Sequence, residues 1–254
     1  MVLDSFKLVG KVAWVTGASR GLGRAMAVAL AEAGADLVLS ARTLIDLEAT
    51  ASEVKRLGRR ALVVQADATR KTDAEAVVAK AIAEFDRIDI LVNNAGVATA
   101  KTLMETEEAD WDRVLSTNVR GPYLCARAVG PHMIARKAGK IINIGSVLSF
   151  IGEPTVVAYA ASKGAILQFT RGLAIEWARY NIQVNAICPG YFVTSLNKSF
   201  LESEEGKAYV GRWVPMRRPG RPEELGPVVV FLASSASDFM TGAHILIDGG
   251  QVAR

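Results

Sequence analysis

The hydrophobic residues of this chain fall into two kinds of segment that alternate along it. Short apolar runs that stop at glycine, asparagine or proline predict buried strands, whereas longer stretches with apolar residues at helical spacing predict helices. The predicted strands span residues 11–16, 36–40, 61–65, 88–92, 140–144, 182–187 and 244–247. The predicted helices span residues 24–33, 44–57, 72–85, 107–133, 155–180 and 222–232. Such repeated strand–helix units predict the α/β class, with one doubly wound parallel sheet.

One long segment breaks this alternation. From Ser195 to Arg221 the sequence is polar, loses a clear strand pattern and contains Trp213 and Pro215. Long connections of this kind commonly cover a binding site, so a substrate lid is predicted at about residues 191–221. No repeat, linker or low-complexity stretch divides the chain, and we therefore expect a single domain over residues 1–254.

Composition narrows the classes of protein that fit. The 254 residues are 50% hydrophobic, which is enough to bury the core of one large domain or of two small ones. No run of about 18 apolar residues is present, so no membrane span is expected. The first ten residues include Asp4 and lack a long apolar core, which argues against a signal peptide. Cys125 and Cys188 match no metal spacing and favour buried thiols in a reducing compartment, so we expect a cytoplasmic protein.

Charge and histidine content exclude two further classes. The net charge is +4, but the basic residues are spread along the chain and no aromatic-basic motif accompanies them, so no nucleic-acid partner is expected. His132 and His244 stand alone, so no metal site is expected either. A mild attraction for anionic small molecules is the simplest interpretation of the charge.

A glycine-rich loop between the first strand and the first helix carries the first candidate chemistry. Gly17, Gly21 and Gly23 follow the strand in the spacing G-x-x-x-G-x-G. Glycines let the backbone approach a pyrophosphate, and a helix N-terminus offers free N–H groups and a positive dipole. The loop therefore predicts a dinucleotide-binding site, although its spacing differs from the G-x-G-x-x-G pattern.

The end of the second strand predicts which dinucleotide binds there. An acidic residue at this position would bind the 2′-hydroxyl of the adenosine ribose and repel a 2′-phosphate. The chain instead has Ser40 and Ala41 followed by Arg42, with Arg20 nearby in the glycine loop. Because guanidinium groups bind phosphate well, we predict a preference for NADP(H), with NAD(H) as the alternative if both arginines are simply solvated.

Polar residues follow the remaining strands at the edge where open parallel sheets bind ligands. Asp67 could accept a hydrogen bond from the adenine amino group or cap the next turn. Ser146, after the fifth strand, could bind a substrate carbonyl or be an ordinary loop serine. Asn118 lies within a predicted helix, where asparagine is unfavourable, and could serve as a polar contact. Further strand-end motifs are Asn93-Asn94-Ala95-Gly96 and Pro189-Gly190.

Tyr159 and Lys163 lie four residues apart at the start of a predicted long helix. Residues at this spacing share one helix face, so a phenol and an ammonium project into the same space. A nearby cation favours the phenolate and lowers the pKa of a tyrosine, which suits a general acid or base. The pair alone is also compatible with plain helix surface.

Taken together, these motifs resemble the short-chain dehydrogenase/reductase family. The resemblance covers about residues 8–251 and implies a seven-stranded, Rossmann-like single domain, nicotinamide chemistry and a homotetramer. The matching positions are Thr16–Gly23, Asp67, Asn93–Gly96, Asn118, Ser146, Tyr159, Lys163, Pro189, Gly190 and Thr194.

The resemblance also implies a role for each matching residue. Tyr159 would exchange a proton with the substrate oxygen, Lys163 would bind the nicotinamide ribose and lower the pKa of Tyr159, and Ser146 would polarise the carbonyl. Asn118 would support a water that links Lys163 to solvent. Asp67 would meet adenine, Asn94 the adenosine-side ribose region and Thr194 the carboxamide. The full predicted cofactor set is Gly17, Ser19, Arg20, Gly21, Leu22, Arg42, Asp67, Asn94, Ala95, Gly96, Tyr159, Lys163, Pro189, Gly190 and Thr194.

The predicted activity is hydride transfer between NADP(H) and a secondary alcohol or ketone, on a small-molecule substrate. The chain looks similar to gluconate 5-dehydrogenase-type sugar-acid oxidoreductases, which suggests a sugar acid such as gluconate. It also looks similar to 3-oxoacyl-carrier-protein reductases, so that activity or a general carbonyl reductase is the alternative. A non-enzymatic cofactor sensor would not need the proton-transfer tyrosine. Predicted pocket residues are both apolar and polar, namely Ser146, Val147, Leu148, Glu153, Tyr191, Phe192 and Asn197.

Overall fold

Seven parallel strands form one sheet in the order β3-β2-β1-β4-β5-β6-β7. This computed structural model describes residues 1–194 and 197–253. The strands are β1 (Val12–Thr16), β2 (Asp36–Ala41), β3 (Ala61–Gln65), β4 (Ile90–Asn93), β5 (Gly139–Ile144), β6 (Ile182–Pro189) and β7 (His244–Ile247). The strand order reverses between β1 and β4, which is the point where open α/β sheets bind ligands.

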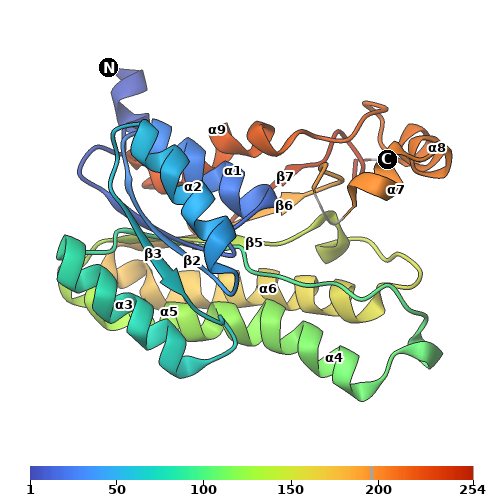
Figure 1. Cartoon of the computed structure of the whole chain (residues 1–254), viewed down its shortest axis with the longest axis horizontal. Coiled ribbons are helices and arrows are strands. Elements are labelled where there is room, and N and C mark those ends of the chain that lie inside the picture. The colour runs from blue at the N-terminus through green and yellow to red at the C-terminus, as the bar shows by residue number, and fades with distance from the viewer. Residues whose placement is uncertain (195–196, 254) are drawn as a thin grey trace.

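Helices cover both faces of this sheet (Figure 1). One layer consists of α1 (Gly21–Glu32), α2 (Leu44–Arg56) and α9 (Gly226–Ala233). The opposite layer consists of α3 (Lys71–Phe85), α4 (Glu108–Leu115), α5 (Gly121–Arg136) and α6 (Val157–Trp177). Two further helices, α7 (Lys198–Glu202) and α8 (Glu204–Trp213), lie beyond one end of the sheet. Short 3₁₀ turns span Val2–Phe6, Leu103–Glu105, Val147–Ser149, Ala178–Tyr180, Pro222–Leu225 and Ser235–Ser237.

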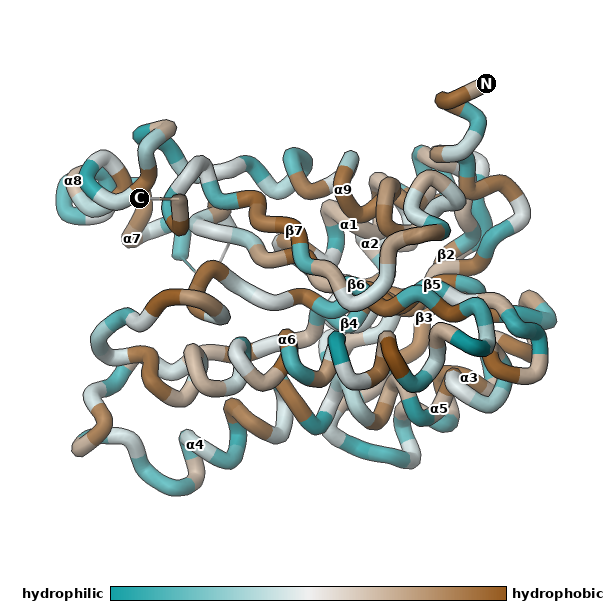
Figure 2. The backbone as a smooth tube through the Cα atoms, turned by 180° about the vertical axis from the view of Figure 1, so that it is seen from behind, coloured by the Kyte–Doolittle hydropathy of each residue, from teal (hydrophilic) through white to brown (hydrophobic). Residues whose placement is uncertain are grey.

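The sheet separates two hydrophobic cores because alternate strand residues point to opposite faces. On β1, Ala13 and Val15 pack toward the core under α1, α2 and α9. Val12 and Trp14 pack toward the core under α3, α5 and α6. All four side chains are at most 2% exposed, so β1 is buried on both faces. Figure 2 shows the corresponding apolar, brown colour along the strands in the middle of the molecule.

The predicted order of strands and helices is confirmed, and the exceptions are local. The prediction of helix over residues 107–133 is confirmed from Glu108 onward, although a π-helical segment at Ser116–Arg120 lies between α4 and α5. Residues 191–221 contain α7 and α8, which the polar sequence did not predict. Residues 195 and 196 of the predicted lid, and residue 254 of the predicted domain, lie outside the described residues.

The described ranges contain no helix long and apolar enough to cross a lipid bilayer. They also contain no group of three or more His, Cys, Asp or Glu side chains that could hold a metal ion. Both cysteines are buried free thiols. Burial raises the pKa of Cys125 to about 12 and that of Cys188 to about 11, which keeps both thiols protonated and unreactive.

Candidate active site

A cavity of about 660 Å³ opens at the carboxyl ends of the central strands. Its lining comes from the loops after β1, β2, β3, β4, β5 and β6 and from the first turns of α6. The cavity brings together every predicted cofactor and pocket residue, whereas Asn118 is not among its lining residues. Residues far apart in the chain thus meet in one site, as expected for strand ends at one edge of a parallel sheet.

The glycine loop takes a backbone path that requires small residues. Gly17 and Gly21 have φ angles of +64° and +56°, in the left-handed region that other residues rarely adopt. A Cβ atom on Gly23 would lie 2.2 Å from the carbonyl oxygen of Gly17. Helix α1 begins at Gly21, so its first free N–H groups lie at this loop.

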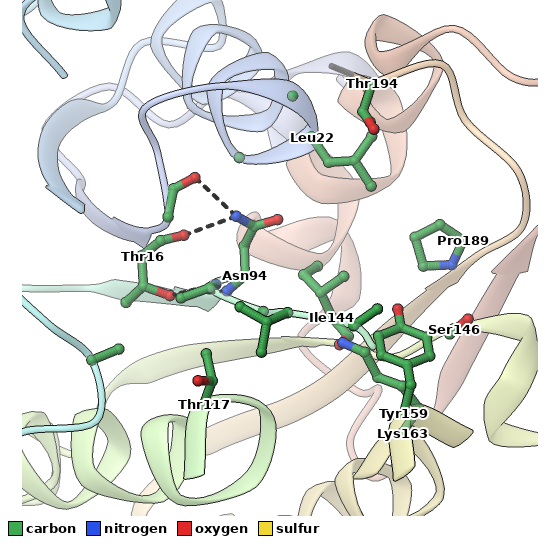
Figure 3. A pocket seen from close by; sticks show the side chains of 18 of the residues that line it. Thr16, Leu22, Asn94, Thr117, Ile144, Ser146, Tyr159, Lys163, Pro189 and Thr194 are labelled. Carbon is green, nitrogen blue, oxygen red and sulfur yellow. Dashed lines mark hydrogen bonds between the residues drawn. The ribbon is translucent and has the colours of Figure 1, made fainter. Parts of the chain in front are cut away.

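Thr16 and Asn94 connect the glycine loop to the loop after β4. The amide nitrogen Nδ2 of Asn94 donates to the carbonyl oxygens of Thr16 and Gly17, at 2.9 and 3.1 Å (Figure 3). The Thr16 hydroxyl oxygen accepts from the backbone N–H groups of Asn94 and Ala95, at 3.0 Å each. Asn94 lines the cavity as predicted, but its amide N–H groups hold the protein loops together.

The end of β2 forms a cationic part of the cavity wall. The buried hydroxyl of Ser40 accepts a hydrogen bond from Trp14 Nε1 at 2.8 Å. Arg20 and Arg42 are both exposed and line the cavity, and within residues 1–194 and 197–253 neither forms an ion pair. Both guanidinium groups are therefore available for an anionic ligand.

Of the two alternatives predicted for Asp67, the cap of the following turn is confirmed, and the contact with adenine stays a prediction. Asp67 lines the cavity, and its Oδ1 also accepts hydrogen bonds from the backbone N–H and hydroxyl of Thr69 at 2.9 and 2.8 Å. Burial raises the pKa of Asp67, but the bonds from Thr69 and the charges of Arg42 and Arg70 outweigh it and leave the pKa lowered. Asp67 is therefore an ionised acceptor at this end of the cavity.

Tyr159 and Lys163 project from the same side of α6 beside Ser146, at the end of β5 (Figure 3). The Nζ atom of Lys163 lies 5.4 Å from the centre of the Tyr159 ring. It donates a hydrogen bond of 2.7 Å to the carbonyl oxygen of Ile144. The Ser146 hydroxyl accepts from the backbone N–H of Leu148 at 3.1 Å, which fixes its orientation toward the cavity. A phenol, an ammonium and a hydroxyl therefore converge on one end of the cavity.

Burial dominates the electrostatics of this group. It lowers the pKa of Lys163 to about 8. Burial also raises the pKa of Tyr159, and hydrogen bonding to Ser146 acts in the opposite direction without reversing the shift. The predicted lowering of the Tyr159 pKa by Lys163 is therefore wrong for the protein chain by itself. Burial removes the phenolate from water, and this destabilises the phenolate more than the neighbouring groups stabilise it.

Asn118 lies behind the cavity rather than in its wall. Its Oδ1 accepts from the backbone N–H of Val97, and its Nδ2 donates to the Val97 carbonyl and to the Ser162 hydroxyl, all at 2.9 Å. These bonds tie the π-helical segment to the loop after β4 and to α6. The polar contact predicted for Asn118 therefore exists within the protein, and its role toward a water remains a prediction.

Residues of the predicted lid contact the loop between β5 and α6. Glu153 Oε1 accepts hydrogen bonds from the hydroxyls of Tyr191 and Tyr209, at 2.9 and 2.7 Å. The Thr194 hydroxyl donates to Asn197 Oδ1 at 3.0 Å, and the Cβ position of Gly21 would lie 3.6 Å from Thr194 Cβ. The predicted lid segment therefore reaches both the glycine loop and the predicted substrate pocket.

Several residues of the site were given no role in the sequence analysis. Thr16, which was named only as a matching position, joins two loops, Thr117 and Phe200 line the cavity, and Tyr209 contacts Glu153 from α8. The threonine hydroxyl at the end of β1 was a usable signal for Thr16. Tyr209 lies 56 positions after Glu153, and no local pattern connects the two.

The cavity fits a nicotinamide dinucleotide. The close backbone packing at Gly17 and Gly23 leaves room for a pyrophosphate at the N-terminus of α1. Arg20, Arg42 and the carboxylate of Asp67 lie at one end, and the Ser146, Tyr159 and Lys163 group lies at the other. The volume is also in the range of cofactor sites.

Known proteins are similar to this chain in sequence and fold over nearly the full length of both chains. A family model described as enoyl-(acyl carrier protein) reductase matches residues 17–251. The 2-dehydro-3-deoxy-D-gluconate 5-dehydrogenase of Escherichia coli K12 is 44% identical, over 100% of both chains. The 5-keto-D-gluconate 5-reductase of the same strain is 39% identical over 98% of both chains. A solved gluconate 5-dehydrogenase from Burkholderia cenocepacia J2315, in complex with NADP and tartrate, is 39% identical over 100% of both chains with a TM-score of 0.95.

These matches agree with the arrangement of the cavity. They identify the protein as an oxidoreductase that acts on CH–OH groups with a nicotinamide cofactor, close to the gluconate and 2-dehydro-3-deoxygluconate 5-dehydrogenases. The chain belongs to the short-chain dehydrogenase/reductase family.

Proposed function

We propose that this protein is an NADP(H)-preferring oxidoreductase that interconverts a secondary alcohol and a ketone on a sugar acid of the gluconate type. The observation that carries the cofactor part is that Arg20 in the glycine loop and Arg42 after β2 line the cavity without an ion-pair partner among the described residues, at a strand end without a carboxylate. The substrate part rests on the named activities of the relatives.

The proposed roles follow from the positions of the side chains. Tyr159 gives a proton to the carbonyl oxygen in reduction and takes it from the alcohol in oxidation. Ser146 donates a hydrogen bond to the same oxygen and stabilises the charge that develops on it. Lys163 binds the ribose next to the reacting ring, with its ammonium group beside Tyr159. The nicotinamide, when bound, supplies or accepts the hydride.

The cofactor preference has a simple electrostatic basis. A 2′-phosphate near the end of β2 would lie within reach of two exposed guanidinium groups, which can bind its oxygens bidentately. No carboxylate at the end of β2 would repel it, because that strand end carries Ser40, Ala41 and Arg42. The NADP complex of the Burkholderia cenocepacia relative supports the same preference.

We also propose that residues 191–221 act as a lid over the substrate, that the chain assembles as a homotetramer and that it works in the cytoplasm. Contacts of Tyr191 and Tyr209 with Glu153 support the lid. The assembly and the location rest on family membership. Size-exclusion chromatography with light scattering tests the assembly, and a monomer at micromolar concentration would contradict it.

A reductase screen tests the activity. Purified protein is assayed with 5-keto-D-gluconate, an acetoacetyl thioester and simple ketones, each with NADPH and with NADH. We expect the highest kcat/KM for 5-keto-D-gluconate with NADPH. A clear preference for the thioester would instead identify a 3-oxoacyl reductase, and equal use of NADH would refute the cofactor preference.

A further inference from the structure

Glu153 is the acidic residue at the substrate end of the cavity. It lies in the loop between β5 and α6, six residues before Tyr159 in sequence, and lines the cavity wall. The other acidic lining residue in the described part of the chain is Asp67, at the opposite end. The cationic lining residues there are Arg20, Arg42 and Lys163, and the first two lie beside the glycine loop and the end of β2. A substrate therefore meets a negative charge near the reacting groups.

Two tyrosines from the lid segment hold this carboxylate in place. Tyr191 donates to Oε1 and Oε2 at 2.9 and 3.1 Å, and Tyr209 donates to Oε1 at 2.7 Å. The rings of the two tyrosines pack edge to face, with centroids 5.4 Å apart. Burial, the bond with Tyr209 and the charge of Glu153 raise the pKa of Tyr191, so its phenol stays protonated and remains a donor.

The hydrogen-bonding capacity of Glu153 is not exhausted by these contacts. A carboxylate accepts about four hydrogen bonds, whereas two phenols supply one hydrogen each. Among the described residues, Oε1 receives both short bonds, and Oε2 receives only the longer contact from Tyr191. Oε2 therefore keeps free acceptor capacity, and the groups that match it are hydroxyl donors on a ligand.

We propose that Glu153 determines substrate specificity by accepting hydrogen bonds from hydroxyl groups of the substrate, next to the carbon that is oxidised or reduced. This inference deepens the proposed function, on which it rests, by assigning an orientation. The hydroxylated part of the substrate lies against Glu153, and a substrate carboxylate points away from it because like charges repel. Ketones without hydroxyl groups leave the carboxylate unsatisfied and are poor substrates.

Matched pairs of ketones test this role. The first pair is 5-keto-D-gluconate and 5-oxohexanoate, which share the carbon chain, the carboxylate and the position of the ketone but differ in hydroxyl groups. The second pair is dihydroxyacetone and acetone, which carry no carboxylate. In each pair we expect the wild-type protein with NADPH to prefer the hydroxylated ketone. In Glu153→Gln the kcat/KM for that ketone should fall about ten- to a hundredfold, mainly through KM, while the deoxygenated ketone changes little.

Two further variants separate specificity from a structural role. Glu153→Asp keeps the carboxylate and should retain part of the preference for the hydroxylated ketone that Glu153→Gln loses. Glu84→Gln removes an exposed carboxylate on α3, outside the cavity lining and the proposed lid, and should leave the ratio of kcat/KM values in each pair unchanged. The melting temperature of each variant with NADPH establishes that it is folded. If Glu153→Gln lowers kcat/KM by the same factor for both ketones of a pair, Glu153 only supports the lid, and the proposal is overturned.

The two pairs also distinguish this inference from the proposed function. If the wild-type protein reduces dihydroxyacetone but not 5-keto-D-gluconate, the sugar-acid assignment fails and the role of Glu153 stands. If it prefers the deoxygenated ketone in both pairs, or reduces no member of either, the role of Glu153 is refuted.

Discussion

The ammonium group of Lys163 is bonded to the backbone of β5, at 2.7 Å from the carbonyl oxygen of Ile144. The lysine is 5% exposed, so a positive charge is held inside the protein next to Tyr159. A single backbone carbonyl does not replace the water that this charge loses, which is why burial lowers the pKa of Lys163 from 10.5 to about 8.

This shift predicts a pH dependence of stability. Between about pH 8 and 10.5 the unfolded chain keeps its proton on Lys163 while the folded chain loses it, so the contribution of Lys163 to the free energy of unfolding rises with pH. Between pH 7 and 9.5 this contribution should rise by about 2 kcal/mol, whereas the raised pKa values of Cys125 and Cys188 act in the opposite direction. Urea denaturation should therefore show a free energy of unfolding that rises, over this range, by about 2 kcal/mol more in the wild type than in Lys163→Met. The exposed control Lys207→Met should behave like the wild type, and identical slopes for all three proteins would contradict the prediction.

Replacing Tyr159 by phenylalanine should separate proton transfer from cofactor binding. The change removes one hydroxyl and leaves the ring against Lys163, so the cavity keeps its shape. A positioned general acid contributes about 10²- to 10⁴-fold to the rate. We therefore expect kcat to fall by at least about 10²-fold. The Kd of NADPH, measured by fluorescence titration, should stay within about twofold of the wild type.

Tyr123→Phe is the matched control for this experiment. Tyr123 is an exposed tyrosine on α5 that hydrogen-bonds to Arg127, and its hydroxyl is remote from the chemistry proposed here. The control should keep full activity. A Tyr159→Phe protein with most of its activity would refute the acid/base assignment.

The sequence was sufficient for the framework of the site because that framework follows local rules. Buried parallel strands appear as apolar runs, and their ends are marked by glycine, asparagine or serine. Gly17, Asn94 and Ser146 were therefore placed correctly at one edge of the sheet, and they line one cavity. Asp67 shows the limit of such reasoning, since it caps the following turn and also lines the cavity, whereas the sequence offered a cap and a ligand contact as alternatives.

Features that depend on tertiary contacts were not predictable in this way. The π-helical segment at Ser116–Arg120 coincides with the bonds between Asn118 and Val97, which lie 21 positions apart. Burial reversed the expected direction of the Tyr159 pKa, and the degree of burial is a property of the whole fold. The contact of Tyr209 with Glu153 likewise depends on how α8 packs, which a polar stretch of sequence does not specify.

Arg42→Ala should narrow the preference for NADPH over NADH. The guanidinium is exposed and lacks an ion-pair partner among the described residues, so its loss removes attraction for a 2′-phosphate without breaking a contact that holds the fold. We expect kcat/KM for NADPH to fall about five- to tenfold while that for NADH stays constant. Arg56→Ala, an exposed arginine on α2 outside the cavity lining, is the control. A wild-type protein that uses both cofactors equally would remove the basis of this prediction.

Gly23→Ala should damage both stability and cofactor binding. An added Cβ would lie 2.2 Å from the Gly17 carbonyl oxygen and 2.4 Å from Asn94 Nδ2, so it would push apart the loops that Asn94 joins. Overpacking of this kind costs about 1–3 kcal/mol in the free energy of unfolding. Urea denaturation measures that cost, and fluorescence titration should show at least a tenfold weaker Kd for NADPH, about 1.4 kcal/mol. Gly211→Ala on α8 meets no atom within 4 Å and should be neutral or slightly stabilising, because alanine favours helix. If the two variants bind NADPH equally well, close packing at Gly23 is not what shapes the phosphate loop.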